Sequence, residues 1–187
     1  MKNICVFCGA SEGAAPIYID SARELGAALV KNGYGLVYGG AKVGTMGAIA
    51  DSVLDAGGVV TGVIPQAIAD MEVAHTGLSS LEVVDDMHQR KARMMALSDA
   101  FLAMPGGLGT LEEIFEAVTW LQLGFHSKPC ALLNTGGFYQ KLDEFLRHAE
   151  RQGFVKKVHR ENLLIIDSIN DLFASIEMWK GSGTSKL

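Results

Sequence analysis

Short apolar runs alternate with amphipathic stretches along the chain, and this alternation limits the possible fold more than any other feature of the sequence. The apolar runs predict strands over residues 3–8, 35–38, 59–64, 81–84, 100–104, 130–133 and 163–166. Helical periodicity predicts helices over residues 16–31, 45–56, 88–97, 111–123, 138–152 and 169–179. Strands that are short and apolar throughout are typical of a parallel sheet covered by helices on both faces. The sequence therefore predicts a single α/β domain built on a doubly wound parallel sheet.

The composition bounds the kind of ligand. A chain of 187 residues that is 49% hydrophobic and 20% charged has enough apolar material for one buried core, which we expect over residues 1–180. Residues 181–187, rich in glycine and serine, are predicted to form a flexible tail. The net charge of -5 lacks the basic excess of proteins that bind nucleic acid polymers, so local cations must hold any anionic ligand. A small phosphorylated molecule fits better than a polymer.

The three cysteines and the lack of a bilayer-length apolar run predict a protein of the cytoplasm, with no membrane partner. Cys5 and Cys8 form a C-x-x-C inside a predicted strand, where this spacing sends the two side chains to opposite faces. The redox motif instead opens a helix, and no second cluster of Cys or His completes a metal site. We therefore expect core cysteines and no metal ion.

The chain ends in Ser185-Lys186-Leu187, which spells the peroxisomal import signal. That interpretation requires a eukaryotic source and an accessible tail. We favour the alternative, a solvated tail that ends in these letters by chance, because the preceding residues have the composition of flexible terminal sequence.

Three predicted strands run into glycine-rich turns, which we name the first (residues 9–13), second (39–47) and third (106–110) glycine turns. A strand, glycines and a helix start together present bare N–H groups and the positive end of a helix dipole to an anion. The P-loop pattern fails because Gly44-Thr45 stands where Gly-Lys-Ser/Thr is needed, and no full G-x-G-x-x-G is present. The turns therefore predict a site for one phosphate or one small nucleotide.

The location of this site follows from the sheet, because parallel α/β sheets bind ligands at the carboxyl ends of their strands. Residues 65–80 have no clear period and are long for a simple connection, so they are predicted to form a lid or a wall of the site.

Two charged clusters lie beside the turns. Arg90 and Arg93 are about one helical turn apart, so both are predicted to face one side while Lys91 points elsewhere. Arginine suits bidentate phosphate contacts, although a solvated basic face is the alternative for Lys91 and Arg93. Thr110 and Glu113 have capping-box spacing, with Thr110 at the N-cap. Alternatively, Glu113 is a carboxylate that stabilises a ribosyl cation and orients water, and both interpretations stay open.

Three strings carry a resemblance to a known family: Tyr38-Gly39-Gly40 with Gly44 and Met46-Gly47, Met87-His88-Gln89-Arg90-Lys91, and the run from Pro105 to Glu113 that reads P-G-G-L-G-T-L-E-E. The chain resembles the LONELY GUY (LOG) family of cytokinin riboside 5′-monophosphate phosphoribohydrolases, which are often labelled "lysine decarboxylase" in error. The resemblance runs from Met1 to about Trp179. It implies a Rossmann-like fold, a homodimer or a higher homo-oligomer, and release of a free base and ribose 5-phosphate from a nucleotide substrate.

The resemblance also implies the roles of individual residues. The motif arginine and the final motif glutamate fall on Arg90 and Glu113, which are the expected catalytic pair. Further expected substrate contacts, from the resemblance and from the glycine turns, are Ser11, Gly39, Gly40, Gly44, Glu72, Lys91, Gly106, Gly107, Leu108, Gly109, Thr110, Glu112 and Thr119. No cofactor is expected, because no lysine lies in a recognisable pyridoxal phosphate setting. The alternatives are a binding protein of the same fold that does not cleave its nucleotide and, with less support, a transferase with a second acceptor site.

Overall fold

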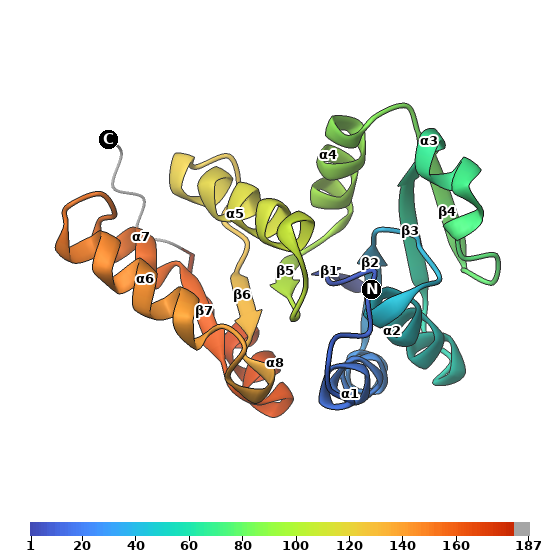
Figure 1. The fold of residues 1–187 in the computed structure, drawn as a ribbon, viewed down its shortest axis with the longest axis horizontal. Coiled ribbons are helices and arrows are strands. Elements are labelled where there is room, and N and C mark those ends of the chain that lie inside the picture. The colour runs from blue at the N-terminus through green and yellow to red at the C-terminus, as the bar shows by residue number, and fades with distance from the viewer. Residues whose placement is uncertain (182–187) are drawn as a thin grey trace.

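The centre of the fold is one sheet of seven parallel strands in the order β4-β3-β2-β1-β5-β6-β7 (Figure 1). The computed structural model describes residues 1–181, and of Glu72 it describes the backbone alone. The strands are β1 (Lys2–Phe7), β2 (Tyr34–Tyr38), β3 (Val60–Pro65), β4 (Ser80–Val84), β5 (Ala100–Ala103), β6 (Cys130–Leu133) and β7 (Leu163–Ile166). Every predicted strand is present, with ends that differ by at most one residue. The last three residues of the chain, with the import-signal question, lie outside the described residues.

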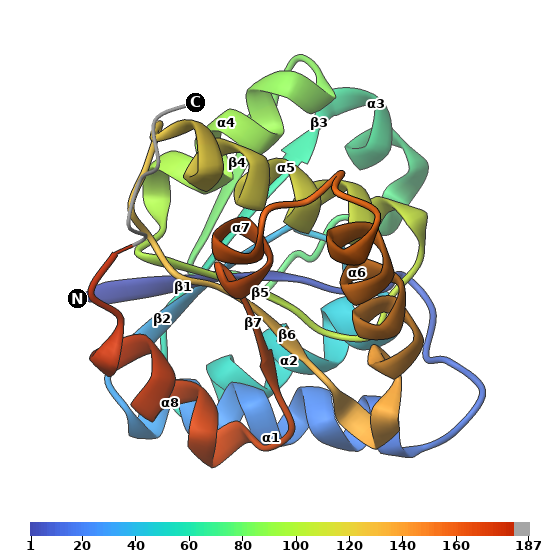
Figure 2. The same cartoon turned by 90° about the vertical axis from the view of Figure 1, so that its left-hand side faces the viewer.

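Helices cover both faces of the sheet (Figure 2). One face carries α1 (Ile17–Lys31), α2 (Gly44–Asp55) and α8 (Ile169–Met178). The other carries α4 (Met87–Leu97), α5 (Leu108–Leu123) and α6 (Gln140–Arg151), with the short α7 (Lys157–Glu161) beside α6. The doubly wound α/β fold is therefore confirmed. Among residues 1–181, no helix is both long and apolar enough to cross a membrane.

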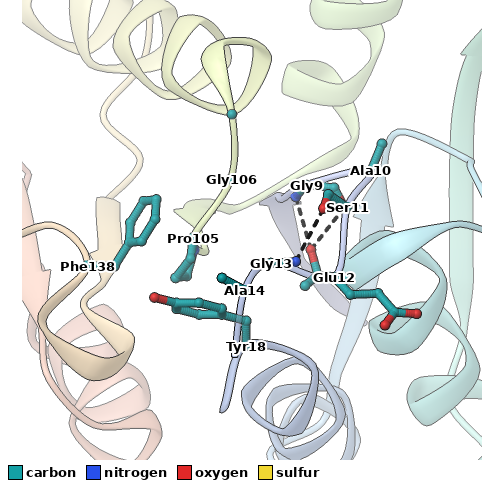
Figure 3. Close-up of a pocket in the computed structure, with 12 residues that line it drawn as sticks. Gly9, Ala10, Ser11, Glu12, Gly13, Ala14, Tyr18, Pro105, Gly106 and Phe138 are labelled. Carbon is teal, nitrogen blue, oxygen red and sulfur yellow. Dashed lines mark hydrogen bonds between the residues drawn. The ribbon is translucent and has the colours of Figure 1, made fainter. Parts of the chain in front are cut away.

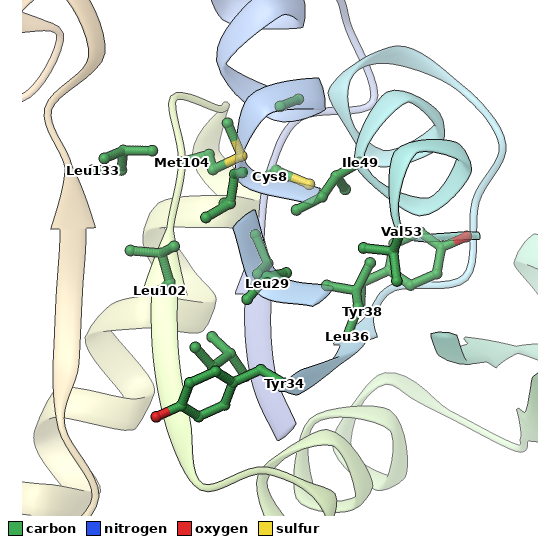
Figure 4. Packing of buried hydrophobic residues seen from close by; sticks show 14 of the residues in the cluster. Cys8, Leu29, Tyr34, Leu36, Tyr38, Ile49, Val53, Leu102, Met104 and Leu133 are labelled. Carbon is green, nitrogen blue, oxygen red and sulfur yellow. The ribbon is translucent and has the colours of Figure 1, made fainter. Parts of the chain in front are cut away.

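Two apolar cores hold the layers together, one on each face of the sheet. Figure 4 shows the core under α1 and α2, where Leu29, Ile49 and Leu102 pack with no exposed surface. Cys8 belongs to this core and Cys5 to the core on the opposite face, and both thiols are free. The prediction that the C-x-x-C residues are core cysteines on opposite faces is confirmed.

The strand order reverses at β1, which lies between β2 and β5. Chains leaving β1 and β5 therefore depart toward opposite faces and leave a crevice at the carboxyl edge. Ile4 pairs with Ala100 and Phe7 with Ala103, so the two strands end side by side. This register places the first and third glycine turns next to each other.

The segment predicted as a lid or wall contains α3 (Gln66–Ile68) and a single π-helical turn, η1 (Ala69–Val73). Its end is fastened to the second glycine turn: the Lys42 N–H donates to the Val73 carbonyl at 2.8 Å, and the His75 N–H donates to the Gly40 carbonyl at 2.9 Å. The segment therefore supports the second turn from outside.

Candidate active site

The first and third glycine turns meet where the strand order reverses. A Cβ atom at Gly9 would lie 3.5 Å from the Cα atom of Gly106, so the two backbones are in contact. Two cavities open beside this contact, and both are lined by Gly9, Ala10 and Gly107. The smaller one, about 300 Å³, is also lined by Cys8, Met46, Met87, Arg90, Gly109, Thr110, Glu112 and Glu113. The predicted catalytic pair thus shares one cavity with the third turn.

The larger cavity, about 530 Å³, has Tyr18, Pro105 and Phe138 on one side and the first turn on the other (Figure 3). Ser11 lines it, and the Ser11 Oγ accepts a hydrogen bond from the Gly13 N–H at 3.3 Å. Sequence analysis missed the two aromatic residues, since no spacing or motif marks an isolated aromatic side chain as part of a cavity wall.

The start of α5 presents free backbone donors to the smaller cavity. Gly107 is the N-cap, and the first helical hydrogen bond runs from the Leu111 N–H to the Gly107 carbonyl. The N–H groups of Leu108, Gly109 and Thr110 donate to no acceptor within residues 1–181, as is usual for a first helical turn. Together with the helix dipole they form a site suited to one anionic group.

Glu113 does not cap this helix. Thr110 is the third helical residue rather than the N-cap, and no side chain caps α5, so the capping-box interpretation is wrong. The Glu113 Oε1 instead accepts a hydrogen bond from the Arg90 Nη2 at 3.0 Å. Both side chains are buried, with residue exposures of 6% for Glu113 and 9% for Arg90. A buried carboxylate paired with a guanidinium therefore lies in α5, about one helical turn after the residues whose backbone N–H groups are free.

Arg90 reaches this position from α4, whose start is fixed by a side-chain cap. The Asp86 carboxylate accepts a hydrogen bond from the Gln89 N–H at 2.8 Å. Such a cap stabilises a helix by about 1 kcal/mol. The Arg90 Nη1 also lies 3.7 Å from the Met87 Sδ, a weak contact within the same helix.

Burial is the main influence on the acidity of Glu113. It raises the pKa of the carboxyl above its ordinary value, while the neighbouring Arg90 acts in the opposite direction. The Glu112 charge raises this pKa further and the Lys91 charge lowers it. Glu113 is therefore a stronger base than a solvated carboxylate. Cys8, in the same cavity, has its pKa raised to about 12 by burial, so its thiol stays neutral near pH 7.

The side chains of Arg90 and Lys91 both form ion pairs with α5, whereas the side chain of Arg93 does not. The Lys91 ammonium bonds to the Glu112 carboxylate and lies 3.2 Å from the Glu116 Oε2, an ion pair without hydrogen-bond alignment. Arg93 is exposed and forms a two-point contact with Glu82 of β4, at 2.6 and 2.9 Å. The prediction that Arg90 and Arg93 share a side is wrong, because α4 lies between β4 and α5 and its charged residues divide between these two neighbours.

The second glycine turn contacts the first turn. The Thr45 and Met46 N–H groups donate to the Ser11 and Gly9 carbonyls, each at 3.3 Å. The Thr45 hydroxyl accepts from the Gly9 N–H and donates to the Gly9 carbonyl, each at 3.0 Å. Gly44 has φ +59°, and a Cβ atom there would overlap the backbone of Ala10. The start of α2 is therefore occupied by the protein's own carbonyl groups.

Some predicted substrate contacts lie outside the two cavities. Gly39, Gly40 and Gly44 of the second turn line neither of them, and neither do Lys91 and Leu108. Thr119 is an exposed residue of α5, and its hydroxyl donates to the Phe115 carbonyl at 2.7 Å. The side chain of Glu72 lies outside the described residues. The structure thus brings Ser11, Arg90, Glu112, Glu113 and the third turn, apart from Leu108, to one crevice. The binding role of every one of these residues stays a prediction.

Comparison with known proteins identifies close relatives. A family model described as "Possible lysine decarboxylase" matches residues 46–176. The cytokinin riboside 5′-monophosphate phosphoribohydrolase of Rhodococcoides fascians is 47% identical over 94% of this chain and 89% of that protein. A protein of the same name from Arabidopsis thaliana is 45% identical over 94% of this chain and 83% of its own length.

Solved structures share the architecture at lower identity. The molybdenum cofactor carrier protein of Chlamydomonas reinhardtii matches with a TM-score of 0.71, covering 95% of this chain and 97% of that one. Its sequence is 19% identical, so this similarity shows the shared fold alone.

Proposed function

The chain belongs to the LONELY GUY family of cytokinin riboside 5′-monophosphate phosphoribohydrolases, and from this premise we propose that it hydrolyses the N-glycosidic bond of such nucleotides. We extend the proposal to AMP, which has the same ribose 5-phosphate. In the reaction, the bond from C1′ to the base nitrogen breaks and a water oxygen bonds to C1′. One proton of that water goes to the base. The products are the free base and ribose 5-phosphate.

One observation carries this proposal: a buried carboxylate, Glu113, is held by Arg90 at 3.0 Å in a cavity that also contains free N–H groups of α5. The amides of the third turn suit the 5′-phosphate. With the phosphate held there, Glu113 faces the ribose, where a carboxylate stabilises positive charge on the sugar and accepts a proton from water.

Arg90 has two roles in this mechanism. Its charge keeps the buried Glu113 ionised, because it lowers the carboxyl pKa that burial raises. Its pairing with Glu113 also fixes the carboxylate in one orientation before substrate arrives, so little reorganisation is needed during reaction.

The decarboxylase wording of the family model has no support at Lys91, which follows Arg90 in the sequence. A Schiff-base lysine must lose its proton readily. The hydrogen bond to Glu112 instead raises the pKa of Lys91, and Glu116 raises it further. The Lys91 ammonium is thus stabilised for an ion pair between α4 and α5.

The test is a paired-substrate assay. Purified protein is incubated with isopentenyladenosine monophosphate and with AMP, and free base and ribose 5-phosphate are separated by chromatography. We expect base release from both, and release that is at least about a hundredfold slower with Glu113→Gln. Tight AMP binding by calorimetry with both nucleotides left intact would reject hydrolysis and favour a nucleotide-binding protein.

We further propose that the protein is a cytoplasmic homodimer. Its three cysteines are buried, free thiols, which suits a reducing compartment. Phe125 and Leu123, next to Trp120 at the end of α5, are exposed by 71% and 48% and form an apolar surface that a second copy can cover. Sedimentation equilibrium tests this: a monomer at micromolar concentration, or a Phe125→Glu variant that remains dimeric, contradicts the proposed surface.

A further inference from the structure

Gly39 lies directly after β2 and faces the guanidinium of Arg90. A Cβ atom built at Gly39 would overlap the Arg90 Nη2, the same nitrogen that donates to Glu113, and would lie 2.5 Å from the Met46 Cε. Gly39 lines neither cavity, so its contact with the predicted catalytic pair is through Arg90.

Space, rather than backbone conformation, is what requires glycine at this position. The φ angle of Gly39 is outside the left-handed region, unlike that of Gly40, so an L-residue can adopt the backbone without strain. The atoms that an added Cβ would meet lie at the ends of two long, flexible side chains, those of Arg90 and Met46. The fold can therefore accept alanine here by moving those two side chains, and the result is a displaced guanidinium.

The guanidinium has few other contacts that fix its position. The Arg90 Nε is buried and has no hydrogen-bond partner within the described residues, and the Nη1 has only the 3.7 Å contact with the Met87 Sδ. The one hydrogen bond to Glu113 therefore fixes the orientation of the guanidinium from one side. On the other side, the guanidinium occupies the space that a side chain at residue 39 would fill.

We propose that Gly39 is a positioning residue: the missing side chain leaves the volume in which the Arg90 Nη2 meets the Glu113 carboxylate. This inference rests on the proposed function, because it assigns Gly39 a role through the catalytic pair instead of the direct substrate contact expected from the glycine turn. It also separates Gly39 from Gly44, whose absent side chain makes room for the first turn.

A double-mutant cycle between Gly39→Ala and Arg90→Lys tests the proposal. A lysine ends without the two Nη branches, so it leaves the volume next to residue 39 free. We expect Gly39→Ala to lower kcat about a hundredfold, as displacement of a catalytic group by about 1 Å does, with little change in KM. In the Arg90→Lys background the same change is expected to have no further effect. An equal fall in kcat in both backgrounds overturns the proposal.

A carboxyl titration of Glu113 by NMR gives a readout that does not depend on turnover. Because Arg90 lowers the pKa of Glu113, displacing the guanidinium raises that pKa, and Gly39→Ala should shift it in the same direction as Arg90→Lys. An unshifted Glu113 overturns the proposal. If the wild-type protein releases no base, the proposed function fails while this titration still decides the role of Gly39.

A third variant separates Arg90 from Met46. Met46→Leu removes the methyl group that an alanine at residue 39 would meet and nearly conserves volume, so Gly39→Ala is placed in this background too. We expect the loss of kcat and the shift of Glu113 to persist. Full recovery of both would assign the effect to Met46 packing and overturn the proposal.

Discussion

Two helices of this fold, α2 and α5, begin at a glycine turn that follows a parallel strand, and their sequences suggest the same anion site. Their first amides differ in the structure. At α2, the Thr45 and Met46 N–H groups donate to carbonyls of the first glycine turn. At α5, the N–H groups of Leu108, Gly109 and Thr110 have no acceptor within the described residues.

The difference teaches that a glycine turn signals close backbone approach, and that the approaching group need not be a ligand. The carbonyl oxygens of Gly9 and Ser11 satisfy the start of α2 as an anion would. The α2 turn therefore builds the crevice and the α5 turn remains open to substrate. Substitutions in the two helices should therefore have different effects on substrate binding and turnover.

The largest effect is expected from Glu113→Gln, on the α5 side. Glutamine keeps the size of the side chain and an oxygen acceptor for Arg90, but it cannot carry the negative charge or accept a proton from water. We expect kcat to fall at least about a hundredfold, the usual contribution of a general base, while circular dichroism and the melting temperature stay close to wild type.

Asp51→Asn is the matched control on the α2 side. Asp51 is an exposed carboxylate of α2 that pairs with His75 at 2.9 Å, and its loss should leave kcat unchanged. Equal losses of activity in the two variants would remove the contrast between the helices.

Much of the fold follows from the sequence, because burial on both faces of the sheet makes inner strands such as β5 and β6 apolar along their whole length. The run from Cys130 to Leu133 is an example: it was predicted with the same ends that the structure has. The sequence predicts that α5 starts at Leu111, but the helix begins at Leu108, because Gly107 needs no side chain to act as its N-cap.

The site was less predictable, because its geometry depends on contacts between helices far apart in the chain. The motif identified Arg90 and Glu113, but only tertiary packing shows that Lys91 accompanies them while Arg93 turns to Glu82. In the sequence, Thr45 is marked only by its place in the second glycine turn. Its bonds to Gly9 could not be inferred, since they cross between two separate turns.

The next effect tests the free amides of α5 directly. Leu108 is the first helical residue and is 86% exposed, so Leu108→Pro removes one N–H group at a position where proline suits a helix. A hydrogen bond to a charged group contributes about 1.5–3 kcal/mol, so AMP affinity by calorimetry should fall about tenfold or more. Leu108→Ala, which keeps the N–H, should bind as wild type. Equal affinities of the proline and alanine variants would show that this amide does not contact the phosphate.

A smaller functional effect is expected when the α2 side is loosened. Thr45→Val removes the hydroxyl that bonds to both backbone groups of Gly9. The Gly9 carbonyl keeps its bond from the Met46 N–H, but the Gly9 N–H is left without a partner, which costs about 1–3 kcal/mol of unfolding free energy. Thr45→Ser should restore that stability, measured by urea unfolding. AMP affinity should fall less than in Leu108→Pro. If Thr45→Val instead weakens AMP binding as much and leaves stability unchanged, α2 is a ligand site and the contrast is broken.

The smallest effect is a shift in pH dependence. Glu113 is proposed to act as a carboxylate, so kcat/KM falls as pH drops through its raised pKa. The Lys91 charge lowers that pKa, so Lys91→Met should raise it further and move the acid limb of the profile to higher pH. Lys42 is an exposed lysine of the second glycine turn, and its charge is not among those that act on Glu113. Lys42→Met should therefore leave the acid limb of the profile in place. If both variants shift the profile equally, the electrostatics of Glu113 are set by the overall charge of the protein rather than by the ion pairs between α4 and α5.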